Sequence, residues 1–228
     1  QNVIQFVEIA TQGNAVDFGD RTITKNGPGG LANQTRAVFA GGGAPVPQSD
    51  VMDFVTIASL GNATDFGNMT SGNKNPACTA SSTRGIIVHG GDPLTNVIDF
   101  ITIATAGNAQ DFGDATVSAE GLVASSSPTR GIIGGGLVSP AQINNIMFIT
   151  IATTGDATDF GDLTQARQEA GGISNSIRAC FASGGVPSAY NTIDFVTIAT
   201  RGDALDFGDT ATSFGYRGGA SDSHGGLS

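Results

Sequence analysis

The chain has 228 residues and a net charge of −10, and 34 of its residues are glycine. Glycine costs a helix about 1 kcal/mol per position relative to alanine, so this composition argues against a helical protein. The 39% of hydrophobic residues argue against disorder, the acidic balance without a basic stripe excludes nucleic acid as a partner, and no apolar run is long enough for membrane insertion.

One segment of the sequence occurs five times and divides the chain into repeats. It has the form I-x-F-[VI]-x-I-A-[TS]-x-G-[ND]-A-x-D-F-G-[DN], and its copies span residues 4–20, 52–68, 98–114, 146–162 and 193–209. The first Phe of each copy is Phe6, Phe54, Phe100, Phe148 or Phe195, which gives spacings of 48, 46, 48 and 47 residues. A regular period of this length indicates an array of similar structural units.

The beginning of each motif predicts a buried strand. Residues 97–104 are rich in β-branched and aromatic residues, and both faces of such a strand are apolar. We therefore expect it in a sheet that is packed on both sides. Gly107-Asn108 then predicts a hairpin turn. A second short strand follows and leads into Asp-Phe-Gly-Asp, which is predicted as an Asx-type turn.

Two further strands are predicted between consecutive motifs. A Gly/Ser/Ala-rich segment gives the third strand, and an apolar segment that ends in glycines gives the fourth. An Arg opens that last strand sixteen residues after each of the first four motifs, at Arg36, Arg84, Arg130 and Arg178. Four short strands in about 47 residues are typical of one propeller blade, whereas the coils of a parallel β-helix are much shorter. The prediction is a single all-β domain over residues 1–228, a five-bladed β-propeller.

The two ends of the chain are predicted to share one blade. Counting sixteen residues on from Asp209 reaches Gly225, and the chain ends at Ser228, so the fifth copy lacks its Arg-led strand. The first copy lacks the strands that should precede it. We expect residues 225–228 to supply the start of that missing strand beside residues 2–20, which removes an exposed sheet edge.

The repeats resemble those of a known group of proteins. Residues 96–114 and 191–209 best match the string Asn-x-Ile-Asp-Phe-Val-Thr-Ile-Ala-Thr-x-Gly-Asn-Ala-x-Asp-Phe-Gly-Asp, and Ser-Thr-Arg-Gly with a glycine run follows the motif. This resembles repeats in virion structural proteins of cyanophages and related marine phages, over essentially the whole chain. The resemblance implies a particle protein, such as a fibre tip or a decoration, and implies no reaction.

Two more distant likenesses concern architecture alone. A di-glycine at the end of an apolar strand, with an aromatic residue some ten residues later, is similar to a degenerate kelch repeat. Five units of about 47 residues resemble tachylectin-type lectins, whose repeats bind amino sugars. The Trp residues that characterise both groups are missing here, so neither likeness carries binding residues over to this chain.

The repeat arginines Arg36, Arg84, Arg130 and Arg178 have two interpretations. A guanidinium can hold a sugar hydroxyl or an anionic glycan. It can equally connect neighbouring blades by bonding an Asp of the Asp-Phe-Gly-Asp segment, and recurrence at one repeat position favours this structural role. The segments after the glycine runs differ in every copy and are the better candidates for binding, at residues 44–49, 92–95, 137–142 and 186–190. Tyr190 is the aromatic residue there that can stack on a sugar.

Metal binding and catalysis have little support in the sequence. The acidic pair around each Phe, such as Asp111 and Asp114, offers oxygen ligands for calcium, but such loops normally carry more carboxylates. Turn capping or pairing with the repeat Arg is favoured, and we expect no metal and no cofactor. His89 and His224 have no nucleophile at a catalytic spacing, so we expect no enzyme. Cys78 and Cys180 are predicted to be free, mostly buried thiols.

The expected function is therefore non-enzymatic. The first hypothesis is a phage virion structural or host-adhesion module, whose partners are other virion proteins and a host-surface glycan bound by the variable loops. The alternative is a free, multivalent carbohydrate-binding lectin with one site per blade, which would be extracellular rather than part of a virion. A propeller enzyme would instead need one asymmetric pocket with clustered carboxylates.

Overall fold

The computed structural model describes residues 2–45, 47–185, 188–215 and 218–221, and these residues form twenty β-strands and no helix. The first sheet has only two strands, β1 (Val3–Phe6) and β2 (Val16–Asp20). Each of the four larger sheets that follow has four antiparallel strands and spans about 40 residues of the chain. The expectation of an all-β protein with four-stranded units is confirmed.

In each of the four larger sheets, the strands lie side by side in the order in which they occur along the chain. The first consists of β3 (Gly29–Ala32), β4 (Arg36–Gly42), β5 (Ser49–Thr56) and β6 (Thr64–Asn68). The second consists of β7 (Ala77–Ala80), β8 (Arg84–Val88), β9 (Val97–Thr102) and β10 (Gln110–Asp114). The third consists of β11 (Val123–Ser126), β12 (Arg130–Gly134), β15 (Asn145–Thr150) and β16 (Thr158–Asp162). The fourth consists of β17 (Gly171–Ser174), β18 (Arg178–Ala182), β19 (Thr192–Thr197) and β20 (Leu205–Asp209). The strands β13 (Leu137–Val138) and β14 (Ala141–Gln142) form a small separate hairpin.

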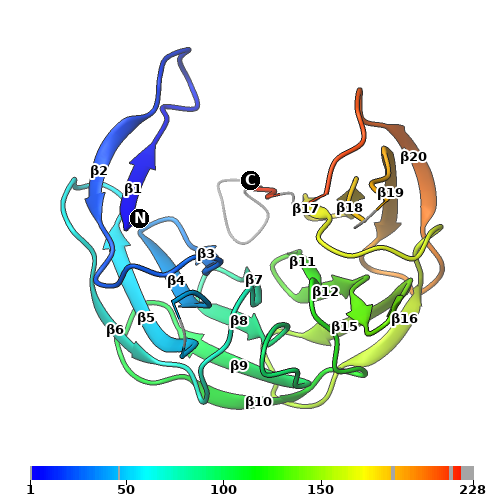
Figure 1. The fold of residues 1–228 in the computed structure, drawn as a ribbon, viewed down its shortest axis with the longest axis horizontal. Helices are drawn as coiled ribbons and strands as arrows, with labels where there is room; N and C mark the ends of the chain where they lie inside the picture. Colours follow the sequence, from blue (N-terminus) through cyan, green and yellow to red (C-terminus); the bar gives the residue numbers. More distant parts are fainter. Residues whose placement is uncertain (1, 46, 186–187, 216–217, 222–228) are drawn as a thin grey trace.

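The sheets are arranged around a central space, with β3, β7, β11 and β17 innermost and in contact with one another in that order (Figure 1). The last strand of each sheet runs along the outer rim. The resulting arc stays open between the β1–β2 hairpin and the β17–β20 sheet (Figure 1). The predicted joint of the two termini falls on residues 225–228, which lie outside the described residues.

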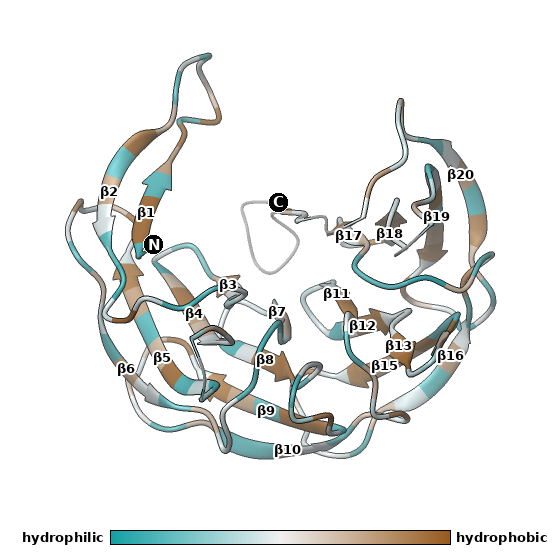
Figure 2. Cartoon of the chain, viewed as in Figure 1, coloured by the Kyte–Doolittle hydropathy of each residue, from teal (hydrophilic) through white to brown (hydrophobic). Residues whose placement is uncertain are grey.

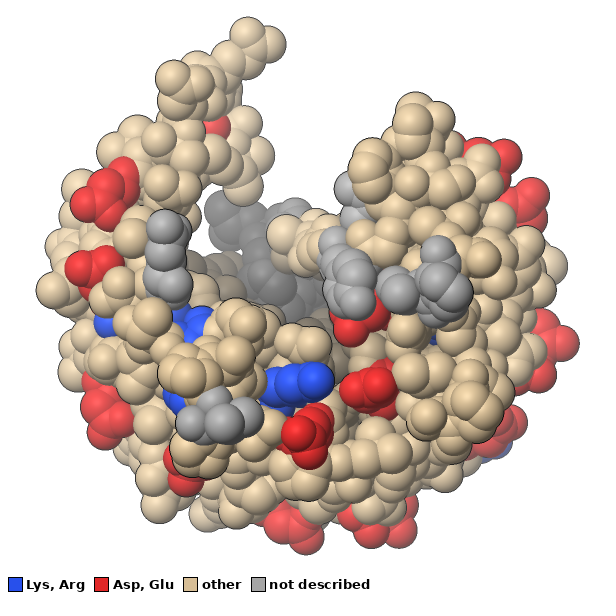
Figure 3. Space-filling model, viewed as in Figure 1, with Lys and Arg blue, Asp and Glu red and all other residues tan. Residues whose placement is uncertain are grey.

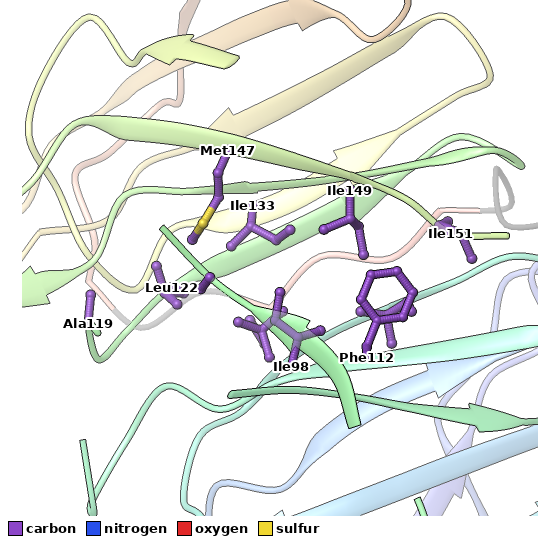
Figure 4. Packing of buried hydrophobic residues seen from close by; sticks show 12 residues of the cluster. Ile98, Phe112, Ala119, Leu122, Ile133, Met147, Ile149 and Ile151 are labelled. Carbon is purple, nitrogen blue, oxygen red and sulfur yellow. The ribbon is translucent and has the colours of Figure 1, made fainter. Parts of the chain in front are cut away.

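The hydrophobic core lies between neighbouring sheets rather than inside any one of them. In the cluster of Figure 4, Ile98 and Phe112 of the β7–β10 sheet pack against Ile133, Met147 and Ile149 of the β11–β16 sheet. Two further clusters occupy the corresponding places between the other four-stranded sheets. The apolar colouring of the middle strands in Figure 2 follows from this packing.

The strand at the start of the motif contributes to two of these clusters. Ile98 of β9 belongs to one cluster, whereas Ile101 and the following Ile103 belong to the cluster on the opposite side of the sheet. Successive side chains of a strand point to opposite faces, so β9 is packed on both faces, as predicted.

One local prediction is wrong, and a second is confirmed only in part. Asp-Phe-Gly-Asp is not a turn but the body of the outermost strand: in β10, Phe112 sits at a β-bulge between Asp111 and Gly113, which pair with consecutive residues of β9. The predicted hairpin is formed by β9 and β10, but residues 103–109 connect the two strands, so Gly107-Asn108 is not itself the tight turn. The Gly-Asn pair instead contacts the neighbouring sheet, where the amide of Gly107 donates to the carbonyl of Phe66 at 2.6 Å.

Candidate functional site

Each of the four repeat arginines lies over a Phe ring of its own sheet. The guanidinium carbon is 4.4 Å from the ring centroid for Arg36 on Phe54, 4.4 Å for Arg84 on Phe100, 4.9 Å for Arg130 on Phe148 and 4.5 Å for Arg178 on Phe195. These are cation–π contacts. The register of the strands brings the groups together, since the Arg opens the second strand and the Phe lies in the third.

Three of these arginines also bond to the next sheet. The Nη1 atom donates to the carbonyl of Ile103 at 3.0 Å from Arg36, of Ile151 at 2.8 Å from Arg84, and of Ile198 at 2.9 Å from Arg130. The acceptors are backbone carbonyls, not the Asp carboxylates that the sequence suggested. The contacts correspond to the structural interpretation, in which the arginines connect neighbouring sheets.

The sequence did not single out a group of buried carboxylates in the middle strands. Asp53, Asp99 and Asp194 occupy the position before the Phe in three motifs, and all three are fully buried. A threonine of the preceding repeat donates to each of them through both its amide and its hydroxyl; for Asp99 the donor is Thr70, at 2.9 and 2.7 Å. An Asp inside an apolar strand was the available signal, because a buried carboxylate needs such donors.

Each of these carboxylates also has a basic partner, but from a different place in the sequence each time. Arg21 Nε donates to Asp53 at 3.0 Å, His89 Nε2 lies 2.9 Å from Asp99, and Arg167 Nη2 donates to Asp194. The partners therefore do not follow the repeat, which is why the sequence alone did not predict them.

Ser71 completes a line of polar groups with this His–Asp pair. Its Oγ atom lies 3.3 Å from Nδ1 of His89, whose other nitrogen faces Asp99. A Ser–His–Asp line can activate a hydroxyl nucleophile. Here, however, the two equivalent carboxylates, Asp53 and Asp194, are paired with arginines. His89 therefore takes the place of a basic partner for a buried Asp. His89 is itself fully buried, so the arrangement has a structural explanation.

The variable segments gather at the end of the sheets opposite the repeat arginines. The arginines open the second strand of each sheet, whereas the variable segments follow its end. We call residues 44–45, 47–49, 92–95, 137–142 and 188–190 the loop face; Val46 and residues 186–187 of the predicted loops lie outside the described residues. Neighbouring loops bond to one another, as when Gln48 Nε2 donates to Asp92 at 2.8 Å.

A cavity of about 150 Å³ opens between two segments of the loop face. It is lined by Gly91, Asp92, Leu94, Glu120, Leu137 and Ser139. Its walls combine two carboxylates and a hydroxyl with two leucines, and Leu94 is half exposed. Ligand pockets are usually about 300–1,000 Å³ in volume, so this smaller cavity is suited to one small polar group, such as part of a sugar unit.

Tyr190 does not lie in that cavity. Its amide donates to the carbonyl of Gly184 at 2.8 Å, and its ring packs on the backbone of Gly185, where an added Cβ would come within 2.8 Å of it. The ring is half-buried. Tyr190 and the four arginines are therefore at opposite ends of the sheets and do not form one site.

A second cavity, of about 300 Å³, lies in the middle of the arc. Its walls come from the innermost strands and from residues 219–221, and they carry mostly small side chains such as Ala32, Thr79 and Ser125. Beside it, burial raises the pKa of the Cys78 thiol to about 12, and Cys180 is also a free thiol, with its pKa raised chiefly by burial. Burial and the Glu120 carboxylate raise the pKa of Glu169, against the opposing effect of Lys74.

The motif carboxylates are spread along the outer rim, where acidic side chains (red) are visible in Figure 3. Among the described residues, no three His, Cys, Asp or Glu side chains are grouped closely enough to hold a metal ion. The carboxylate that caps a backbone group here is that of Asp156 in the neighbouring sheet, whose Oδ1 accepts from the amide of Asp114 at 3.0 Å. No helix in the described part of the chain is suited to crossing a bilayer.

Comparison with protein-family models and with curated proteins gives no match for this chain.

Proposed function

We propose that the chain is a non-enzymatic β-propeller of a phage particle, a structural or host-adhesion module that binds a cell-surface glycan through its loop face. The resemblance of the repeats to virion proteins supports the particle, and the structure of the sheets supports a binding module. Its partners are other virion proteins and the host glycan.

The propeller that we propose has five blades and is shared between the two ends of the chain. Four blades are the four-stranded sheets, and the β1–β2 hairpin is the outer half of the fifth. Residues 218–221 support this arrangement, because they lie against β17 in the place of the next innermost strand: Ser221 Oγ is 3.3 Å from Ser174 Oγ, and Gly219 packs on the backbone of Gly172.

The contacts of the repeat arginines are the observation that supports placing the binding surface on the loop face. The guanidinium groups of Arg36, Arg84 and Arg130 donate to backbone carbonyls of the next sheet. These repeated residues therefore stabilise the scaffold. The loop face departs from that period in sequence and in shape, and it holds a cavity lined by Asp92 and Glu120. Surface loops on a rigid scaffold commonly carry binding function.

The experiment is a glycan array with matched variants. We expect the unmodified chain to bind a restricted set of glycans, and Asp92→Asn with Glu120→Gln to weaken that binding at least about tenfold, which is 1.4 kcal/mol. Asp111→Asn on the outer rim is the control and should leave binding unchanged. An array without hits, combined with infection that is unaffected by loop exchange, refutes the adhesion function.

The stoichiometry of binding separates this proposal from the free lectin. The proposed site is the cavity lined by Asp92 and Glu120, so calorimetry should give one glycan per chain. Several equal sites per chain, together with absence of the protein from purified particles, would favour the multivalent lectin.

A further inference from the structure

Neighbouring sheets are connected by the same set of hydrogen bonds at four places. In the connection between the third and fourth strands of one sheet, the amide of the Gly of the Gly-Asn or Gly-Asp pair donates to a carbonyl of the preceding sheet. The acceptor is the second Phe of the motif, in Asp-Phe-Gly. The four bonds are Gly61 to Phe18 at 2.9 Å, Gly107 to Phe66 at 2.6 Å, Gly155 to Phe112 at 2.7 Å and Gly202 to Phe160 at 2.9 Å.

Two more bonds recur beside each of these. At the contact between β10 and the next sheet, the amide of Ala157 donates to the carbonyl of Asp114 at 2.8 Å, and the amide of Asp114 donates to Oδ1 of Asp156 at 3.0 Å. The backbones approach so closely that a Cβ on Gly113 would come within 2.6 Å of Gly155. We call this three-bond contact the sheet joint; at the three joints between four-stranded sheets, the Arg-to-Ile bond described above accompanies it.

Both halves of a fifth sheet joint exist in the chain and face the opening of the arc. On one side is β20, whose Phe207 is 57% exposed although the equivalent Phe112 and Phe160 are 2% exposed. On the other side is the connection of the β1–β2 hairpin, where Ile9 is 97% exposed although the equivalent Ile103 and Ile151 are at most 1% exposed. Each of these two surfaces lacks the neighbouring sheet against which the equivalent surfaces pack.

The side chains of the β17–β20 sheet form a partly apolar hollow on this surface. A cavity of about 420 Å³ is lined there by Ile173, Arg178, Cys180 and Phe207, together with Ala220 and Ser221. Arg178 lies on its Phe ring as the other repeat arginines do. In the other three repeats the guanidinium reaches the motif isoleucine of the next sheet, and the corresponding isoleucine for Arg178 is Ile9.

We propose that the β1–β2 hairpin of the same chain docks on β20 through a fifth sheet joint. Arg178 then donates to the carbonyl of Ile9, Gly13 to that of Phe207 and Ala15 to that of Asp209, while the amide of Asp209 donates to Asn14. The interaction surface is continuous with the four joints already formed and uses the same atoms. This inference rests on the five-bladed arrangement proposed above and gives its closing contact.

The hairpin of the same chain is a better occupant than that of a second copy. Residues 218–221 already lie beside β17, so the innermost strand that the hairpin needs is in place on the correct surface. A tethered partner also has an effective concentration in the millimolar range, which a second molecule does not reach in dilute solution.

The experiment is cysteine cross-linking at matched positions. In a chain with Cys78→Ala and Cys180→Ala, the pair Asn14→Cys with Asp209→Cys probes the fifth joint, and Asp20→Cys with Asn62→Cys probes an existing one. With a short bismaleimide, both pairs should give an internally linked monomer at rates that agree within a few-fold. Linked dimers, or a linked control beside an unlinked test pair, overturn the proposal.

A second readout does not depend on the engineered thiols. Arg178→Met should lower the urea midpoint as much as Arg84→Met does, because in the closed arrangement each arginine makes one bond to a motif isoleucine. A markedly smaller loss for Arg178→Met contradicts closure. Neither result depends on a glycan, so a chain that binds no glycan can still pass both tests.

Discussion

Replacing Arg84 by Met should destabilise the protein through the loss of its contacts at one sheet joint. The guanidinium donates to the carbonyl of Ile151 at 2.8 Å and lies 4.4 Å from the centre of the Phe100 ring. A hydrogen bond from a charged donor contributes about 1.5–3 kcal/mol, and a cation–π contact contributes about 0.5–2 kcal/mol. Arg84 is only half-buried, so we take values near the lower ends, and we expect a loss of about 2 kcal/mol in the free energy of unfolding.

The measurement is urea unfolding followed by circular dichroism, with Arg84→Lys and Arg201→Met alongside. Lys keeps the charge but loses the planar stacking, so it should lose about 1 kcal/mol. Arg201 is exposed and lies 5.2 Å from the Phe148 ring, so its replacement should change stability by less than about 0.5 kcal/mol. A loss below about 0.5 kcal/mol for Arg84→Met refutes the reasoning that these arginines hold the sheets together.

Three further predictions follow from the buried groups. His89→Ala should leave Asp99 as a buried carboxylate without its basic partner and lower the free energy of unfolding by about 3–5 kcal/mol; thermal unfolding of the variant checks this, and a change under about 1 kcal/mol contradicts it. Gly113→Val should lower the free energy of unfolding by at least about 2 kcal/mol, because the φ of Gly113 is +142° and its Cβ would meet the backbone of Gly155. Gly107→Ala should be nearly neutral, because no atom lies within 4 Å of its added Cβ. Equal losses in urea unfolding of the two variants would show that the close approach is unimportant. With a pKa of about 12, Cys78 holds only about one part in ten thousand as thiolate at pH 8 and should gain reactivity as the pH rises towards 12, so Ellman's reagent should modify Cys180 well before Cys78; simultaneous modification of the native protein argues against this burial.

The sheet joints explain why the period of the sequence is so regular. The motif glycines and the small residues around them lie where the backbone of one sheet meets that of the next, as Gly113 and Gly155 show. A larger residue at Gly113 separates two sheets, because its Cβ meets the backbone of Gly155 and a side-chain rotation cannot relieve that contact; a Cβ on Gly155 itself meets no atom within 4 Å. The repeat is therefore set by contacts between sheets as much as by the strands themselves.

The residues of the candidate site that recur with the repeat could be predicted, and those whose partners lie far away in the chain could not. The arginines recur, so the sequence pointed to them, but two roles stayed open because spacing does not show what lies beyond the guanidinium. The acceptor of Arg84 is a carbonyl 67 positions further along the chain, and no local pattern reports such a bond. The basic partners of Asp53, Asp99 and Asp194 were missed for a related reason: Arg21, His89 and Arg167 come from different positions of the repeat and meet a common carboxylate only after folding.

The sequence by itself determined the strands, their grouping by fours and the two apolar faces of β9, because these depend on local propensity and on the alternation of side chains along a strand. Only the tertiary structure decided that Asp-Phe-Gly-Asp is a bulged outer strand and that Gly107-Asn108 is a contact between sheets, because both segments take their conformation from the neighbouring sheet. It likewise placed the variable segments on one face, opposite the arginines. That separation arises because antiparallel strands return the chain to the same two ends of every sheet.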